Sequence, residues 1–230
     1  MPHVGEYSFM RCIYFVNSTL SCESLIYDNN IFINNLTFLL FYTNIVIMDS
    51  QRLERNLAAN EAYVKINFPG ENFISDTAQF QAANRYSKGL IIPKNVRVAE
   101  SRIPISPDQR NVLRKELRQA EILARLGNSV YIIPEHIGYK IKPKDAVVNG
   151  ELFEFKTVTG NARTLEWEFR KAKKKGDDVN VFISIESDIS RNETEHRVKL
   201  VLDRHPEFTG KIVVSWRGGK PHFWDTSNFR

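Results

Sequence analysis

The chain has 230 residues, of which 42% are hydrophobic. This is enough to form a hydrophobic core, so the composition excludes a protein too polar to fold. Its formal net charge of +5 and sequence pI of about 9.1 permit an anionic partner such as nucleic acid without requiring one. The two cysteines, Cys12 and Cys22, both lie near the N-terminus, so the rest of the chain can form neither a disulfide framework nor a thiolate metal site.

Residues 1–47 differ in composition from the rest, with no lysine and a single arginine, Arg11. Their apolar run, 31–48, is interrupted by three asparagines, whereas a spanning helix needs about 20 mostly apolar residues. The run also begins late and has no cluster of positive charge before it, which is unlike a secretory signal. We therefore expect a non-native or disordered upstream extension of the reading frame, with the natural start at Met48. A membrane anchor is the alternative.

Residues 48–105 are predicted to form a small N-terminal accessory region. The hydrophobic pattern predicts two helices and two short strands, over 50–63, 77–86, 90–92 and 96–98. In the first helix, Leu53, Leu57 and Ala58 share one side. Because no catalytic constellation is evident here, packing support for the next domain is the simplest interpretation. A substrate-binding arm and a junction with a delivery region are the alternatives.

A long helix opens the second predicted domain, residues 106–230. Ser106 suits the N-cap and Pro107 the first helical position, and Gly127 ends the helix after about residue 126. One side of this helix carries an apolar stripe, formed by Leu113, Leu117, Ala120 and Ala124.

Two acidic residues of this helix are candidates for a functional site. Glu116 borders the apolar stripe, because it lies three residues after Leu113 and four before Ala120. Glu121 is displaced around the helix from that position. For either residue, a solvated acid on a charged helix is the alternative.

A strand over 129–133 precedes a predicted hairpin. Its turn is Asn149-Gly150, a dipeptide that favours a two-residue type I′ turn and thereby fixes the register of the two strands. The register pairs Val148 with Glu151, Val147 with Leu152, Ala146 with Phe153, and Asp145 with Glu154.

Side chains alternate along a strand, so Phe153 and Phe155 face the core while Glu154 and Lys156 share the opposite face with Asp145. Two carboxylates directly opposed, with Cβ atoms roughly 5 Å apart, repel each other. A divalent cation between them would turn this repulsion into binding, since hard cations take oxygen ligands. An exposed strand face with scattered charges is the alternative.

A basic helix is predicted over 162–175. Leu165, Phe169 and Ala172 form its apolar face. Its positive charges could follow a phosphate backbone, and its tryptophan could stack on a base. The candidate nucleic-acid-binding residues are Arg163, Trp167, Arg170, Lys171 and Lys174. A solvated basic helix end that complements the helix dipole is the alternative.

The C-terminal part alternates strands and a helix, predicted over 179–185, 192–204, 211–216 and 222–224. Together with the preceding elements this order predicts an α/β (α+β) fold, with a mixed sheet flanked by helices.

One motif of the hairpin resembles the signature of PD-(D/E)xK nucleases: Asp145 is followed, after eight residues, by Glu154-Phe155-Lys156. The context resembles the C-terminal tRNA nuclease domains of contact-dependent growth inhibition toxins, in which a helix and an apolar strand lead into this hairpin. The similar helix positions are Glu116, Ala120, Leu123, Ala124 and Gly127. The chain departs at Lys144, where the superfamily has proline, with Pro143 one position earlier. The resemblance covers roughly residues 107–216.

This resemblance implies a restriction-endonuclease-like core that hydrolyses phosphodiester bonds with a divalent cation, Mg²⁺ or Mn²⁺, with Zn²⁺ as an alternative. Asp145, Glu154 and the backbone carbonyl of Phe155 would bind the ion, joined by Glu116 or Glu121. Lys156 would orient the attacking water or stabilise the charge that develops on the phosphate.

The same resemblance implies tRNA in preference to DNA as the substrate, an immunity protein as partner, and a cytoplasmic site of action reached by delivery as a toxin. No membrane partner is expected either, because the interrupted apolar run 31–48 is a poor spanning helix. Three alternatives remain open: a DNA endonuclease of restriction or resolvase type, a non-catalytic nucleic-acid-binding protein on the same fold, and a stand-alone nuclease of a phage or mobile element.

Overall fold

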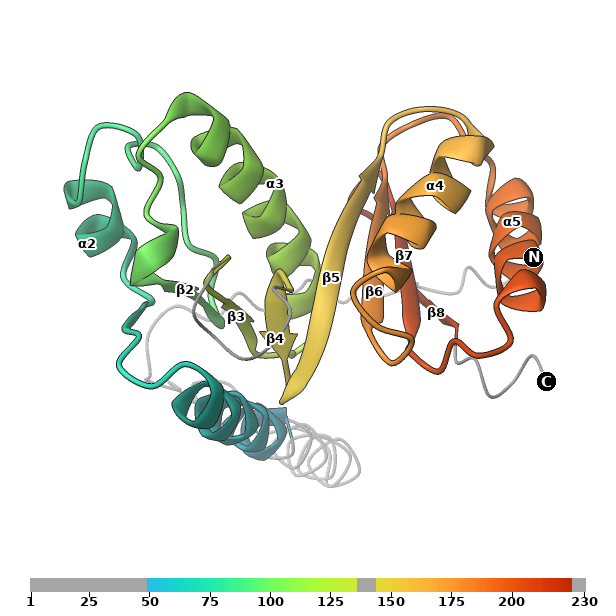
Figure 1. The fold of residues 1–230 in the computed structure, drawn as a ribbon. Helices are drawn as coiled ribbons and strands as arrows, with labels where there is room; N and C mark the ends of the chain where they lie inside the picture. The colour runs from blue at the N-terminus through green and yellow to red at the C-terminus, as the bar shows by residue number, and fades with distance from the viewer. Residues whose placement is uncertain (1–48, 136–143, 225–230) are drawn as a thin grey trace, which may run out of the picture. The chain divides into compact units, whose positions relative to one another are not determined.

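The computed structural model describes residues 49–135 and 144–224 (Figure 1). The predictions made for 1–47 lie outside these residues. Among the described helices, none is both long and apolar enough to cross a bilayer.

Within the described residues, eight strands form one mixed sheet in the order β1 to β8. β1 is antiparallel to β2, β2 is parallel to β3, and β4 is antiparallel to both of its neighbours, β3 and β5. β5, β6 and β7 are parallel, and β8 closes the sheet antiparallel to β7. The strands are Phe73–Ile74, Val96–Ala99, Val130–Ile132, Ala146–Val148, Glu151–Val158, Asn180–Ile185, Ile212–Trp216 and His222–Trp224. The fold is therefore α/β with a mixed sheet, as expected.

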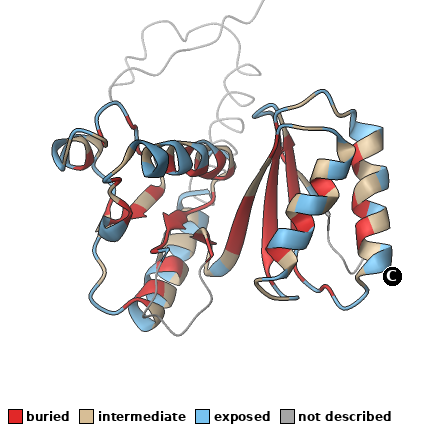
Figure 2. Ribbon diagram, turned by 45° about the horizontal axis from the view of Figure 1, so that its top comes forward, coloured by how far each residue is buried: buried red, intermediate tan, exposed pale blue. Residues whose placement is uncertain are grey.

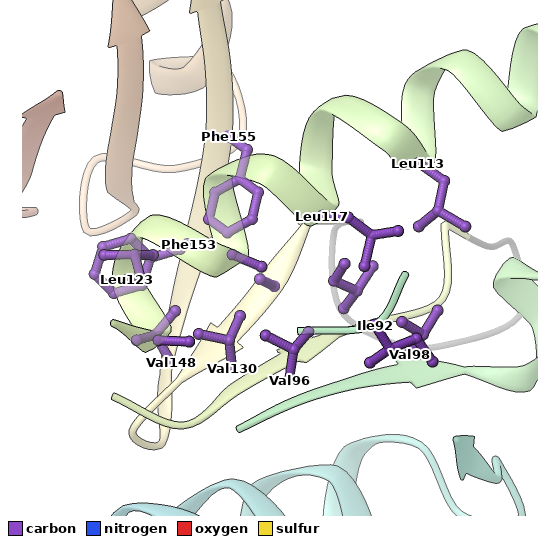
Figure 3. Packing of buried hydrophobic residues seen from close by; sticks show 14 of the residues in the cluster. Ile92, Val96, Val98, Leu113, Leu117, Leu123, Val130, Val148, Phe153 and Phe155 are labelled. Atoms are coloured by element: carbon purple, nitrogen blue, oxygen red, sulfur yellow. The ribbon is translucent and has the colours of Figure 1, made fainter. Parts of the chain in front are cut away.

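Helices cover both faces of the sheet. The described helices are 49–67, α2 (Thr77–Ala82), the 3₁₀ helix η1 (Glu100–Arg102), α3 (Pro107–Ala124), α4 (Ala162–Lys173) and α5 (Arg191–Arg204). α3 packs against one face of β2 to β5, where its leucines contact valines and the two phenylalanines of β5 (Figure 3). The opposite face is covered by the helix over 49–67 at β3 and β4 and by α4 and α5 at β6 and β7. Figure 2 shows the buried sides of α4 and α5 turned toward the buried strands.

Local sequence signals set the starts of these helices. The Ser106 side chain accepts a hydrogen bond from the backbone N–H of Gln109, and Asn161 caps α4 in the same way through Arg163 N–H. Pro107 occupies the first turn of α3 as expected.

The hairpin has the predicted register, with Val148 opposite Glu151 and Ala146 opposite Phe153. Asn149 and Gly150 both have positive φ, 52° and 87°, as a type I′ turn requires. The predicted pair of Asp145 with Glu154 is not part of this ladder: Asp145 N–H donates to the carbonyl of Phe153, the residue opposite Ala146, over 3.1 Å. The Asp145 side chain, instead of its backbone, then accepts from Phe155 N–H.

Two predictions in the accessory region are wrong. The second helix ends at Ala82 instead of 86, because Asn84 Oδ1 accepts from the N–H groups of Tyr86 and Ser87 and thereby competes with the helix. Residues 90–92 form no strand. Side chains satisfy their backbone instead: Gln81 donates to the Leu90 carbonyl and Thr77 Oγ1 accepts from Ile92 N–H.

The first helix is also longer than predicted, 49–67, and its Ala58 is exposed. Its buried side includes Asn60 and Val64, and Phe68, just after its end, is also buried. Residues 49–105 contribute β1 and β2 to the same sheet, so this region shares its core with the rest of the described chain.

Asn60 joins this first helix to the hairpin turn. Its side chain is fully buried, donates to the carbonyl and hydroxyl of Ser129 at 2.9 and 3.0 Å, and accepts from Gly150 N–H at 2.7 Å. We expect Asn60→Ala to lower the free energy of unfolding by roughly 2–4 kcal/mol, because each buried group left unsatisfied costs about 1–3 kcal/mol.

Urea denaturation measures this loss, with Asn67→Ala as the matched control. Asn67 lies on the same helix, and its side-chain bond within the described residues is a local one, to the carbonyl of Tyr63 one turn earlier, at 2.9 Å. The control should change the free energy of unfolding by less than about 1 kcal/mol. Equal losses in both variants would contradict the role given to Asn60.

Candidate active site

The site is centred on the middle of β5. By strand alternation, Glu154 and Lys156 lie on the sheet face of Leu152 and Val158, opposite the face that α3 covers. Asp145 lies beside them, since its Oδ2 accepts a hydrogen bond from Phe155 N–H at 2.6 Å. The structure therefore brings together the carboxylates and the lysine that the hairpin register predicts.

Glu154 is the most buried of these groups, with no exposed surface. Lys156 Nζ lies 2.5 Å from its Oε1, and Lys175 Nζ lies 2.6 Å from its Oε2. The same Lys175 ammonium is 4.0 Å from Asp145 Oδ1. A positive charge thus lies between the two carboxylates.

Lys175 reaches this position from the turn that follows α4. Its backbone carbonyl accepts a hydrogen bond from Lys144 Nζ, which ties the end of α4 to the residue before Asp145. The contact fixes the lysine-bearing turn beside the hairpin, although the two segments are 31 residues apart.

Burial raises the pKa of Glu154, and the neighbouring Asp145 carboxylate raises it further. The ammonium groups of Lys156 and Lys175 act in the opposite direction by stabilising the ionised form. The Glu154 carboxylate therefore depends on these two ammonium groups to stay ionised away from water.

Glu116 is held by a buried arginine. Arg102, from η1, pairs with the Glu116 carboxylate, lies 3.1 Å from Glu135 Oε1, and donates to the Ile133 carbonyl. Burial raises the pKa of Glu116 to about 7, Arg102 opposes this rise, and the charge of Asp145 adds to it. Glu116 is therefore electrostatically linked to the site.

Glu121 lies elsewhere. Its exposed carboxylate pairs with Arg125 at 2.5 Å, one turn along α3. It lines a separate cavity with Ser184 and Glu186, at the carboxyl end of β6. Of the two helix acids, Glu116 is the one that the structure associates with Asp145.

Among the described residues, no three His, Cys, Asp or Glu side chains group into a ready-made metal site. A divalent ion would have two carboxylates, Asp145 and Glu154, and the carbonyl of Phe155. The N–H and C=O of one strand residue point toward the same neighbouring strand. Since Phe155 N–H donates to Asp145, the Phe155 carbonyl also points toward Asp145. This set fits Mg²⁺, which usually keeps several waters and binds one or two carboxylates. The Lys175 ammonium shows that the position accepts a cation.

The five predicted nucleic-acid-binding residues are all exposed and follow one stripe along α4, opposite its buried face. Trp167 is 51% exposed. The Arg170 guanidinium and the Lys171 ammonium lie 5.8 and 5.3 Å from the centre of its ring. The stripe ends at Lys174, one residue before Lys175.

Sequence reasoning did not assign Arg102 or Lys175 to the site. Lys175 belongs to the run of basic residues that ends α4, but it lies past the last helical turn, where the helical period no longer predicts direction. The sequence around Arg102 does not indicate its role, because the pairing of β2 with β3 brings its partners close to it.

No protein-family model matches the chain, and no curated protein matches it significantly. Among solved structures, it is similar to a chain of the complex described as the CdiA-CT/CdiI toxin and immunity complex from Burkholderia pseudomallei. The two chains are 24% identical with a TM-score of 0.41, and the match covers 53% of this chain and 91% of that chain. Function must therefore be inferred from the residues of the site.

Proposed function

We propose that the chain is a metal-dependent endonuclease of the PD-(D/E)xK type that hydrolyses phosphodiester bonds in nucleic acid. One observation supports this above the others: Asp145 and the fully buried Glu154 lie together with the ammonium groups of Lys156 and Lys175. A surface patch of scattered charges would leave Glu154 in water, where its charge costs little.

Asp145, Glu154 and the Phe155 carbonyl would hold the ion. When bound, a divalent cation lowers the pKa of its water and neutralises charge on the phosphate. Lys156, held against Glu154, is placed to orient the attacking water or to stabilise charge on the phosphate oxygens. Glu116 is locked by Arg102, so it would contact the ion only through water, and its charge acts together with that of Asp145.

A tRNA substrate is favoured by the resemblance of the hairpin and its preceding helix to tRNA nuclease domains of toxins. The exposed basic stripe on α4 adds phosphate contacts beside the site. A toxin of this kind would act in the cytoplasm of its target and have an immunity protein as partner.

The experiment is to incubate the full chain with total tRNA, with plasmid DNA and with linear duplex DNA. Each mixture receives Mg²⁺, Mn²⁺ or EDTA, and Asp145→Asn serves as the inactive comparison. We expect cleavage of tRNA with either metal and no cleavage with EDTA or with the variant. Cleavage of DNA alone would replace tRNA with DNA as the substrate. Binding without any cleavage would reject the enzyme and favour a non-catalytic nucleic-acid-binding protein.

A further inference from the structure

Trp167 is the large aromatic side chain that α4 exposes to solvent. It projects from the side of the helix opposite Leu165, Phe169 and Ala172, which are buried against the sheet. Burying an indole usually stabilises a protein, so an exposed position beside two cations gives this ring no evident packing role.

The surroundings of the ring suit a nucleic-acid strand. Arg163 lies one turn before Trp167, and Arg170, Lys171 and Lys174 follow within two turns. Arg163 and Arg170 make no ion pair among the described contacts, so their charges are available to phosphates. An exposed aromatic ring set among cations combines the two contacts that proteins use to bind unpaired strands, base stacking and phosphate neutralisation.

The stripe also leads to the site. α4 ends at Lys173, six residues or about 9 Å along the helix from Trp167. Lys175 lies in the turn that follows, and its ammonium is 2.6 Å from Glu154 Oε2. A few nucleotides of an extended strand would span that separation, with one base on the ring and a phosphate near Glu154.

We propose that the enzyme selects an unpaired segment of nucleic acid by stacking one of its bases on Trp167, a few nucleotides from the bond to be cut. A base inside a duplex has both faces covered by its neighbours and cannot stack on the ring. Every base has a π-face, so this contact selects unpaired strands without selecting sequence. The inference rests on the proposed function for the cutting step only, because recognition can be measured without metal.

The test measures binding of a fluorescently labelled RNA oligonucleotide by anisotropy in EDTA, alone and annealed to its complement, with the full chain. The single strand should bind more tightly than the duplex. Trp167→Ala should weaken single-strand binding by between about 5-fold and 150-fold, the range for loss of one stacked base, and duplex binding by less than about twofold. Trp167→Phe should keep most of the affinity.

Two controls separate stacking from other effects. Phe223→Ala removes another exposed aromatic, 56% exposed and on the opposite face of the sheet, and should change nothing. Arg163→Gln removes a phosphate contact and should weaken both forms alike. A Trp167→Ala variant that binds both forms as the wild type does, or weakens both equally, would overturn the inference. A DNA single strand of the same sequence shows whether the preference includes DNA.

A hairpin RNA with an unpaired loop, given Mg²⁺, separates this inference from the proposed function. Cleavage confined to the loop and lost in Trp167→Ala supports both. Cleavage of stem and loop alike, independent of Trp167, overturns the inference and leaves the nuclease. Absence of cleavage together with selective single-strand binding rejects the nuclease and supports the recognition.

Discussion

Replacing Glu154 by glutamine is expected to lower the rate of metal-dependent cleavage on the order of 10³-fold, the upper scale for removing one preorganised group from an active site. Glutamine keeps the shape of the side chain but lacks the charge that holds a divalent ion. It also removes the partner of Lys156 and Lys175, whose ammonium groups would no longer be held in place. The rate should be measured with Mg²⁺ and Mn²⁺ on the substrate that the wild type cuts.

Glu151→Gln is the matched control. Glu151 lies on the same strand and also pairs with a lysine, Lys211 at 2.7 Å, but it is exposed and away from Asp145. The control should retain the wild-type rate, and circular dichroism should show that both variants are folded. A Glu154→Gln variant with more than a tenth of the wild-type rate would remove this residue from the chemistry.

The hairpin was predictable because its signals are local. Asn149-Gly150 adopts positive φ at both positions for reasons contained in the two residues, and the turn then fixes the three strand pairs up to Ala146 opposite Phe153. The same is true of α3, where Ser106 and Pro107 determine the first turn. Strand alternation alone therefore predicted that Glu154 and Lys156 lie on the sheet face opposite Phe153 and Phe155.

The remaining parts depend on contacts between distant segments. Asn60 is 90 residues from Gly150, and nothing near it in the sequence indicates that it accepts from the hairpin turn. Lys175 and Arg102 are likewise placed by tertiary packing, the first by the docking of α4 on β5 and the second by the entry of β2 into the sheet. A one-dimensional pattern predicts the face of an element, but not which element lies opposite it.

Arg102→Met is expected to lower the free energy of unfolding by about 3–5 kcal/mol at pH 8, the usual cost of removing one partner of a buried ion pair. The side chains of Arg102 and Glu116 are only 5% and 8% exposed, so water cannot replace the guanidinium. Methionine retains much of the arginine stem, and the loss therefore reports mainly on the missing charge.

The pH dependence identifies the cause. Burial raises the pKa of Glu116 in the folded chain to about 7, above the ordinary value of 4.5 for a glutamate, and Arg102 opposes that rise. Without Arg102 the folded pKa rises further. A group whose folded pKa lies above its unfolded value stabilises the fold at low pH and loses that contribution as the pH rises through the folded pKa. The loss in Arg102→Met should therefore be smaller at pH 5, where Glu116 takes up a proton, than at pH 8.

Urea denaturation at both pH values, with two further variants, tests this account. Arg102→Met combined with Glu116→Gln removes the buried charge as well and should recover most of the stability at pH 8. Arg97→Met breaks a partly exposed pair with Glu61 at 3.2 Å and should cost less than about 1 kcal/mol at either pH. A loss in Arg102→Met that does not change with pH and persists in the double variant would mean that Arg102 stabilises the fold through packing. In that case Glu116 would owe its position to α3 alone.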